Sequence, residues 1–152
     1  MSIDRNQMRS LVVRSLARRK IGGESIGGRA AENLVLGVFA QESGMGSYLR
    51  QMGNGPALGF GQMEPKTYQW LHDKFIPRIG ELHKYVFPML EWDIDHMILM
   101  TRLFFRAFPD PLPAEHDIAG MAELWKRRYN TIHGKGTEAQ FIDNYKRFVI
   151  ET

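Results

Sequence analysis

The segment from Trp92 to Phe108 limits the folds open to this chain more than any other. At helical spacing its apolar side chains cover most of the circumference of a helix, and they are Ile94, Met97, Ile98, Met100, Leu103, Phe104 and Phe105. A helix that is apolar on nearly every side must be enclosed by other elements, since none of its faces is suited to water. The sequence therefore predicts a mainly α-helical fold with this segment as the buried central helix.

The whole chain, residues 1–152, is expected to form one domain of about six to eight helices. Its length is sufficient for one hydrophobic core, and 43% hydrophobic residues is ordinary for a soluble globular protein. We expect a basic N-terminal helix over residues 1–20, a core over 29–137 and a C-terminal helix over 138–152. A flexible link is predicted after the first helix, because it contains Gly22, Gly23, Gly27 and Gly28.

Local signals predict further helices within the core. One spans residues 29–43, a second spans residues 65–75, and a third is capped by Asp117. The inner stripe of the third helix runs through Trp125 to Tyr129, and the following Asn130 lies off that stripe. A long glycine-rich loop over residues 44–58 separates the first two of these helices.

A carboxylate stands in an unusual place at the end of the helix over residues 29–43. The apolar stripe of that helix continues through Val38 to Glu42, and Gly44 ends the helix soon afterwards. Burial and the negative end of the helix dipole both disfavour the charged form, which raises the carboxyl pKa. A carboxylic acid protonated near neutral pH is what a general acid needs. The alternative is a helix-end glutamate whose side chain extends into solvent.

Three short motifs follow one another along the chain. The first is the pair Glu42-Ser43, and the last is Tyr129-Asn130 with Gly134 and Gly136 after it. Between them lies a glycine-rich run that contains Gly59, Phe60, Gly61, Gln62, Met63, Pro65 and Thr67. Together, over residues 29–137, the motifs resemble the lysozyme-like domain of lytic transglycosylases, relatives of the goose-type lysozymes. The third match is partial, because the family has small residues beside the Tyr-Asn pair where this chain has Arg128 and Thr131.

The resemblance implies a peptidoglycan-cleaving enzyme that acts on the β-1,4 bond between MurNAc and GlcNAc. In that family one glutamate, here Glu42, acts first as acid and then as base. The 6-hydroxyl of the muramoyl sugar attacks in place of water and forms a 1,6-anhydro end. An irregular or short β loop would line the sugar groove, and the Tyr129 hydroxyl would bond to Glu42. The implied substrate-binding residues are Ser43, Gly59, Phe60, Gln62, Met63, Tyr129 and Asn130.

No cofactor is expected for this chemistry, and no metal site is predicted. Asp93, Asp95 and His96 lie close together in sequence, but they form an incomplete ligand set, and such spacing is common by chance. The chain has no cysteine, so it has neither a disulfide framework nor a zinc ribbon.

Three other functions stay open on the sequence. Glu64 stands where the family usually has an apolar residue, so a hydrolytic lysozyme that uses Glu64 to activate water is one alternative. Its place at the start of a helix favours the ionised form that a base needs. Another alternative is an inactive structural virion or tail component with this fold. A nucleic-acid-binding domain would use the basic N-terminal residues but leaves the glycine-rich run without a role, so no nucleic-acid partner is expected.

Charge and targeting signals bear on where the protein acts. A net charge of +3 and a sequence pI near 9.3 suit a polyanionic partner. They do not indicate whether that partner is cell wall, nucleic acid or anionic lipid. The basic N-terminal helix could bind a membrane surface or an anionic polymer, or present a solvated face while it packs on the domain. No membrane-spanning stretch and no secretory signal are predicted. We expect a cytoplasmic product that acts on glycan strands in the periplasm or cell wall, released by lysis or carried in a phage particle beside tail or other virion proteins.

Overall fold

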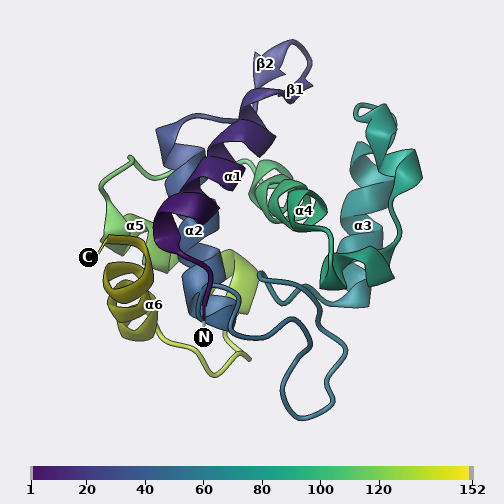
Figure 1. Cartoon of the computed structure of the whole chain (residues 1–152). Helices are drawn as coiled ribbons and strands as arrows, with labels where there is room; N and C mark the ends of the chain where they lie inside the picture. The colour runs from purple at the N-terminus through teal and green to yellow at the C-terminus, as the bar shows by residue number, and fades with distance from the viewer. Residues whose placement is uncertain (1, 151–152) are drawn as a thin grey trace.

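The computed structural model describes residues 2–150, and it is mainly helical, as the sequence predicts. Within these residues the chain forms α1 Arg5–Ala17, β1 Lys20–Ile21, β2 Glu24–Ser25, α2 Arg29–Ser43, α3 Pro65–Phe75, α4 Ile94–Arg106, α5 Ile118–Leu124 and α6 Glu138–Tyr145 (Figure 1). Two short 3-10 helices, Gly80–Lys84 and Phe87–Glu91, lie between α3 and α4. Two π-helical turns, Trp125–Asn130 and Lys146–Ile150, extend α5 and α6.

Helix α4 forms the centre of the fold, which confirms the prediction of a buried central helix. Its residues from His96 to Phe105 are all buried, and α1, α2 and α3 pack around it (Figure 1). The Asp93 side chain accepts a hydrogen bond from the His96 backbone N–H at 3.0 Å and so begins the helix. Because α4 is apolar nearly all round, enclosure by its neighbours removes most of its apolar surface from water.

Helix α2 has the bounds that the sequence predicts, and it carries Glu42 in its last turn. Gly44 ends the helix in the left-handed conformation with φ of 57°, and its N–H donates to the Ala40 carbonyl at 3.1 Å. Gly37 allows α6 to pack closely, since a Cβ there would lie 2.7 Å from Cζ of Phe141. Contacts with α1, α4 and α6 therefore hold α2 in place and fix the end that carries Glu42.

The link between α1 and α2 is a small β-hairpin and not the flexible connection predicted from its glycines. Its two strands pair in antiparallel register, with Lys20 opposite Ser25. Gly22 and Gly23 form the turn with φ of 60° and 83°, a region that glycine adopts without strain. These two glycines therefore specify a tight turn.

Helix α1 packs on the domain through its apolar side. Met8, Val12 and Leu16 are fully buried. Among the basic side chains around this face, Arg9 donates to Oδ1 of Asn33 in α2 at 2.8 Å. The N-terminal helix is therefore packed on the domain, with Arg14 and Arg18 exposed and Arg9 partly buried.

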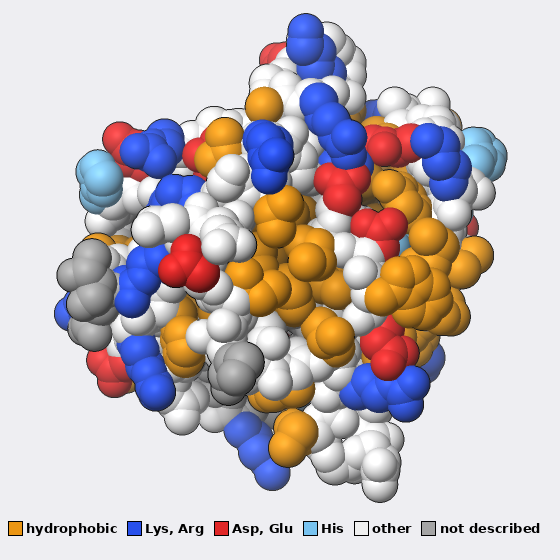
Figure 2. Space-filling model, viewed as in Figure 1, with side chains coloured by type: hydrophobic (Ala, Val, Ile, Leu, Met, Phe, Trp, Pro, Cys, Tyr) orange, Lys and Arg blue, Asp and Glu red, His pale blue; other side chains and the backbone are white. Residues whose placement is uncertain are grey.

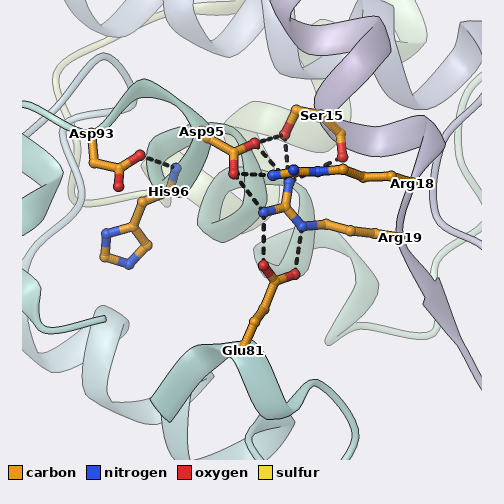
Figure 3. Close-up of polar contacts among 7 residues, drawn as sticks. All are labelled: Ser15, Arg18, Arg19, Glu81, Asp93, Asp95 and His96. Carbon is orange, nitrogen blue, oxygen red and sulfur yellow. Dashed lines mark hydrogen bonds and ion pairs between the residues drawn. The ribbon is translucent and has the colours of Figure 1, made fainter. Parts of the chain in front are cut away.

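A network of ion pairs joins α1 to α4 and to the chain between α3 and α4 (Figure 3). Arg19 is only 4% exposed, and it donates to Asp95 at 2.7 and 2.8 Å and to Glu81 at 2.7 and 3.2 Å. Ser15 and Arg18 also donate to Asp95. Burial raises the pKa of Asp95, but the hydrogen bonds from Arg19 and Ser15 outweigh burial and lower the pKa to about 2. Asp95 is therefore a charged partner that holds these elements together.

Figure 2 shows one face of the molecule, on which basic and acidic side chains are interspersed. An apolar patch lies near its centre, where α1 and α4 border a groove of about 400 Å³ lined in part by Leu11, Ile94 and Ile98. None of the helices in the described part of the chain has the length and apolar character needed to cross a membrane.

Candidate active site

Glu42 lies in the wall of an open cavity of about 590 Å³. Four parts of the chain meet there: the last turn of α2, residues 48–67, Phe104 of α4, and residues 129–134. Six of the predicted site residues line the cavity, and they are Glu42, Gln62, Met63, Tyr129, Asn130 and the possible second carboxylate Glu64. The other lining residues are Tyr48, Gln51, Met52, Ala57, Thr67, Phe104, Thr131 and Gly134.

The Glu42 carboxyl group is largely enclosed, although the residue keeps an edge on the cavity. Burial raises its pKa and a hydrogen bond from Trp125 lowers it, which leaves a pKa of about 7. Trp125 is fully buried, and its Nε1 donates to Oε2 of Glu42 at 3.1 Å. The Tyr48 hydroxyl donates to the backbone carbonyl of Glu42 at 2.7 Å. A carboxyl with this pKa is substantially protonated at neutral pH, as a general acid has to be.

Tyr129 lines the same cavity but does not hydrogen-bond Glu42, so that part of the prediction is wrong. Its hydroxyl donates to the Gly61 carbonyl. A Cβ on Gly61 would lie 2.9 Å from Oη of Tyr129, so glycine provides the room for this bond. Burial raises the pKa of Tyr129 well above its usual value, and the charge of Glu42 adds to the rise. The two residues therefore interact through charge, while Trp125 supplies the hydrogen bond to the carboxyl.

The π-helical turn Trp125–Asn130 brings both of its end residues to the site. Hydrogen bonds in such a turn join residues five apart, as when the Thr131 N–H donates to the Lys126 carbonyl at 2.8 Å. The wider turn places Asn130 on the same side as Trp125, whereas an ordinary α-helix would direct it elsewhere. Asn130 therefore lines the cavity, although the sequence places it off the inner stripe.

Lys126 and two glycines fix the loop that follows this turn. The Lys126 ammonium donates to Oδ1 of Asn130 at 2.6 Å and to the carbonyls of Gly134 and Gly136 at 3.1 and 2.8 Å. A Cβ on Gly134 would lie 2.4 Å from Oδ1 of Asn130, and one on Gly136 would lie 2.6 Å from the Trp125 ring. The glycines after the Tyr-Asn pair thus leave the space that Asn130 and Trp125 occupy.

The glycine-rich run forms another wall of the cavity. Leu58 makes isolated β-bridges to Arg50 and to Met63, so the loop has the short β pairing that the resemblance implies. Gln62 has φ of 48°, and its Nε2 donates to the Gly59 carbonyl at 2.9 Å. This internal bond fixes the Gln62 side chain where it lines the cavity beside Met63.

Three of the predicted substrate-binding residues do not line the cavity. Ser43 is fully buried, and its hydroxyl donates to the Phe39 carbonyl at 3.1 Å and accepts from the Gly46 N–H at 3.0 Å. Phe60 is 2% exposed and packs on Phe39 with ring centroids 5.6 Å apart. Gly59 forms a turn with φ of 81°. These residues shape the walls, because their contacts are made inside the protein.

Glu64 is exposed and lines the same cavity, immediately before α3. Its side chain makes no capping hydrogen bond to that helix. Among the described residues that line the cavity, Glu42 and Glu64 are the only acidic ones and none is basic. A lining of this kind suits a neutral ligand rich in hydroxyl groups better than an anionic one.

Trp125 is a site residue that the motifs do not identify. Sequence reasoning places it on the inner stripe one turn before Tyr129 and treats it as a core residue. A usable signal exists, because a buried indole N–H has to find an acceptor. Phe104 and Gln51 also line the cavity, and nothing in their sequence context marks them as site residues.

No protein-family model, curated protein or solved structure matches this chain. Its function is therefore inferred from the geometry of the cavity and from the resemblance carried by the motifs. The geometry of the cavity points to Glu42 because its carboxyl group is enclosed, and the motifs point to Glu42 because it belongs to the Glu-Ser pair.

Proposed function

We propose that this protein cleaves the glycan strands of peptidoglycan at the MurNAc–GlcNAc β-1,4 bond, as a lytic transglycosylase. The observation that carries the proposal is Glu42, an enclosed carboxyl with a pKa of about 7 in the wall of a cavity whose described lining has no basic residue. A protonated carboxyl so placed is suited to donate its proton to a glycosidic oxygen. Further support comes from Gln62, Tyr129 and Asn130, motif residues that line the same cavity.

In the proposed reaction Glu42 serves first as acid and then as base. Its proton goes to the GlcNAc oxygen, which leaves with the electron pair of the broken glycosidic bond. The carboxylate then takes the proton of the muramoyl 6-hydroxyl, whose oxygen bonds to the anomeric carbon and closes the anhydro ring. Glu42 ends protonated, and no water is consumed. Because the Trp125 indole is bonded to Oε2, Oε1 is the oxygen assigned to carry the proton.

The side chains around Glu42 suit an amino sugar. Gln62 and Asn130 bring amide groups, and Thr67 brings a hydroxyl, which together can pair with the amide and hydroxyl groups of such a ligand. Met63 and Phe104 are 4% and 6% exposed, so they close the apolar side of the cavity wall.

A hydrolytic lysozyme is the second candidate, and the position of Glu64 beside the cavity favours it. Cleavage by water normally uses a second carboxylate to activate the water. The chain has no Asp or Glu between Glu42 and Glu64, so Glu64 is the group that this mechanism would need from the loop.

Mass spectrometry of digested, purified peptidoglycan distinguishes the two reactions, because anhydro ends and reducing ends differ by one water. We expect anhydro ends from the wild-type protein and the same products from Glu64→Gln. Glu42→Gln is expected to fold and to lose cleavage by about a hundredfold or more. Reducing ends that vanish in Glu64→Gln would support hydrolysis, and a folded, fully active Glu42→Gln protein would refute the role of Glu42.

The proposed substrate lies outside the cytoplasm, so the proposed place of action is the periplasm or the cell wall. Lysis, or delivery in a phage particle beside tail proteins, would bring the protein there. An inactive virion component is the alternative, and a wild-type protein that releases no fragment from peptidoglycan would support it.

A further inference from the structure

Helix α3 carries one aromatic side chain that the core does not enclose. Tyr68 and Leu71 are 2% and 0% exposed, whereas Trp70 is 43% exposed. Trp70 follows Thr67 by three residues, so the two lie on one side of α3, about 5 Å apart along its axis. Because Thr67 lines the cavity that holds Glu42, the exposed indole stands one helical turn beyond the cavity wall.

Aromatic contacts continue this surface from the cavity to Trp70. Phe104 lines the cavity and packs on Tyr129 with ring centroids 4.7 Å apart. The Trp70 ring lies 6.5 Å from Phe104 and 5.7 Å from Phe108, at interplanar angles of 78° and 50°. Edge-on and tilted contacts of this kind hold one side of the indole and leave part of its surface open to solvent.

The charged groups beside Phe108 pair with one another. Arg128 lies over the Phe108 ring, 4.5 Å from its centroid, and pairs with Asp110 at 2.8 Å. Arg127 pairs with Asp110 at 2.8 Å and with Glu123 at 2.7 Å. Two guanidinium groups thus meet two carboxylates, so this cluster offers no net charge to attract a charged peptide.

From this placement we infer that Trp70, held against Phe104 and Phe108, forms an additional subsite for the sugar rings of a glycan strand, next to the cavity that holds Glu42. The inference rests on the proposed function. A pyranose ring has an apolar face of C–H groups, which packs well on a fixed aromatic ring while the sugar hydroxyls stay in water. The paired charges beside Phe108 leave no net charge on that side of the aromatic cluster, which fits the neutral sugar backbone of a glycan. Such a subsite makes long strands better ligands than short ones.

Binding of glycans of increasing length tests the subsite without requiring cleavage. In the full-length Glu42→Gln protein, calorimetric titration with peptidoglycan-derived glycans of two, four and six sugars is expected to show affinity that rises with length. Adding Trp70→Ala is expected to weaken binding of the six-sugar glycan about tenfold and to leave the two-sugar affinity unchanged. Trp92→Ala is the matched control, because Trp92 is 64% exposed and is not among the described residues that line the cavity.

Three results overturn the subsite: unchanged six-sugar affinity in Trp70→Ala, an equal loss in Trp92→Ala, or no binding at any length. Cleavage by the wild-type protein is measured separately and tests the proposed function. If the wild-type protein does not cleave peptidoglycan but glycan binding rises with length and depends on Trp70, the proposed subsite stands and the proposed enzymatic function is refuted. If the wild-type protein cleaves peptidoglycan but Trp70→Ala does not change glycan binding, the proposed enzymatic function stands and the proposed subsite is refuted.

Discussion

Two opposing effects on one carboxyl group decide the chemistry available to Glu42. Burial favours the neutral acid, and the Trp125 indole N–H favours the charged carboxylate. Burial has the larger effect, so the pKa of Glu42 is about 7. Both protonation states are then populated near neutral pH, which suits a residue that has to give a proton and later take one.

Replacing Trp125 by phenylalanine is expected to move the pH profile of cleavage to higher pH. Loss of the indole N–H removes a bond that stabilises the Glu42 carboxylate, so the pKa of Glu42 rises above its present value of about 7. Because the reaction begins with the acid form, wild-type cleavage falls as the pH rises through about 7, and the variant keeps its activity to higher pH. Release of soluble fragments, followed from pH 5 to pH 9, measures the midpoint.

The control for this variant changes packing and keeps the hydrogen bond. The Trp125 ring packs on Phe141 at a tilt of 33°, with ring centroids 5.4 Å apart, so Phe141→Leu disturbs the surroundings of the indole but leaves its N–H in place. We expect the midpoint of Phe141→Leu to match wild type. If the pH midpoint of cleavage is the same in Trp125→Phe as in wild type, the Trp125 indole does not lower the pKa of Glu42.

A methyl group on Gly136 is expected to reduce cleavage about tenfold or more. Its Cβ would lie 2.6 Å from the Trp125 ring, so the ring has to shift, and the shift disturbs its hydrogen bond to Glu42. Gly80→Ala is the matched control, because a Cβ there meets no atom within 4 Å. Cleavage and near-ultraviolet circular dichroism are measured together. If Gly136→Ala cleaved peptidoglycan at the wild-type rate, the position of the Trp125 ring would not be needed for cleavage.

At the scale of elements, the bounds of helices follow from local signals more readily than the direction of their side chains. Helices α2 and α3 have the predicted bounds because Gly44 ends one and Pro65 begins the other. The π-helical turn has no such local signal, since its wider hydrogen bonding depends on how Trp125 packs and on what Lys126 binds. The place of Asn130 in the site therefore could not be predicted from helical spacing.

The Arg19 network is expected to stabilise the joint between α1 and α4. Arg19→Ala removes a buried cation from Asp95 and Glu81, and we expect it to lower the free energy of unfolding by about 2 kcal/mol, because both carboxylates keep some contact with water. Arg18→Ala is the matched control. The Arg18 side chain is 58% exposed, so its loss is expected to cost less than about 1 kcal/mol. Urea denaturation measures both variants.

The pH dependence of this joint follows from Asp95. Its pKa is lowered from 3.8 to about 2, so the native state holds the charged carboxylate more strongly than the unfolded chain does. That stabilisation is present above about pH 4 and is lost as the pH falls toward 2. Arg19→Ala should show a smaller loss over this window. A loss parallel to that of wild type would mean that Arg19 does not set the pKa of Asp95.

At the scale of the whole molecule, the site exists because segments distant in sequence pack together. Trp125 and Glu42 are 83 residues apart, and Tyr129 and Gly61 are 68 apart. The order of the motifs predicts which segments meet. It does not predict which atoms bond, because a hydrogen bond depends on displacements smaller than a side chain. Tyr129 accordingly reaches the Gly61 carbonyl, and Ser43 turns into the core.

Enclosing Glu42 is expected to lower the stability of the whole fold at high pH. The pKa of Glu42 is raised from 4.5 to about 7, so the unfolded chain loses this proton first as the pH rises. The stability contribution of the neutral acid is therefore full below about pH 4.5 and is lost as the pH rises through about 7. At 1.36 kcal/mol per pKa unit, a rise of about 2.5 units corresponds to a loss of roughly 3 to 4 kcal/mol.

Glu42→Gln removes the titrating group and keeps an oxygen that can accept from Trp125. Its free energy of unfolding, relative to wild type, should therefore be higher at pH 8 than at pH 4, as urea denaturation can measure. Glu64→Gln is the matched control, because Glu64 is exposed, and its difference from wild type should be small at both pH values. An equal difference for Glu42→Gln at both pH values would contradict the enclosure of the acid. A variant that gains stability at pH 8 and loses cleavage would show that the fold holds this acid at a cost in stability, as functional groups often require.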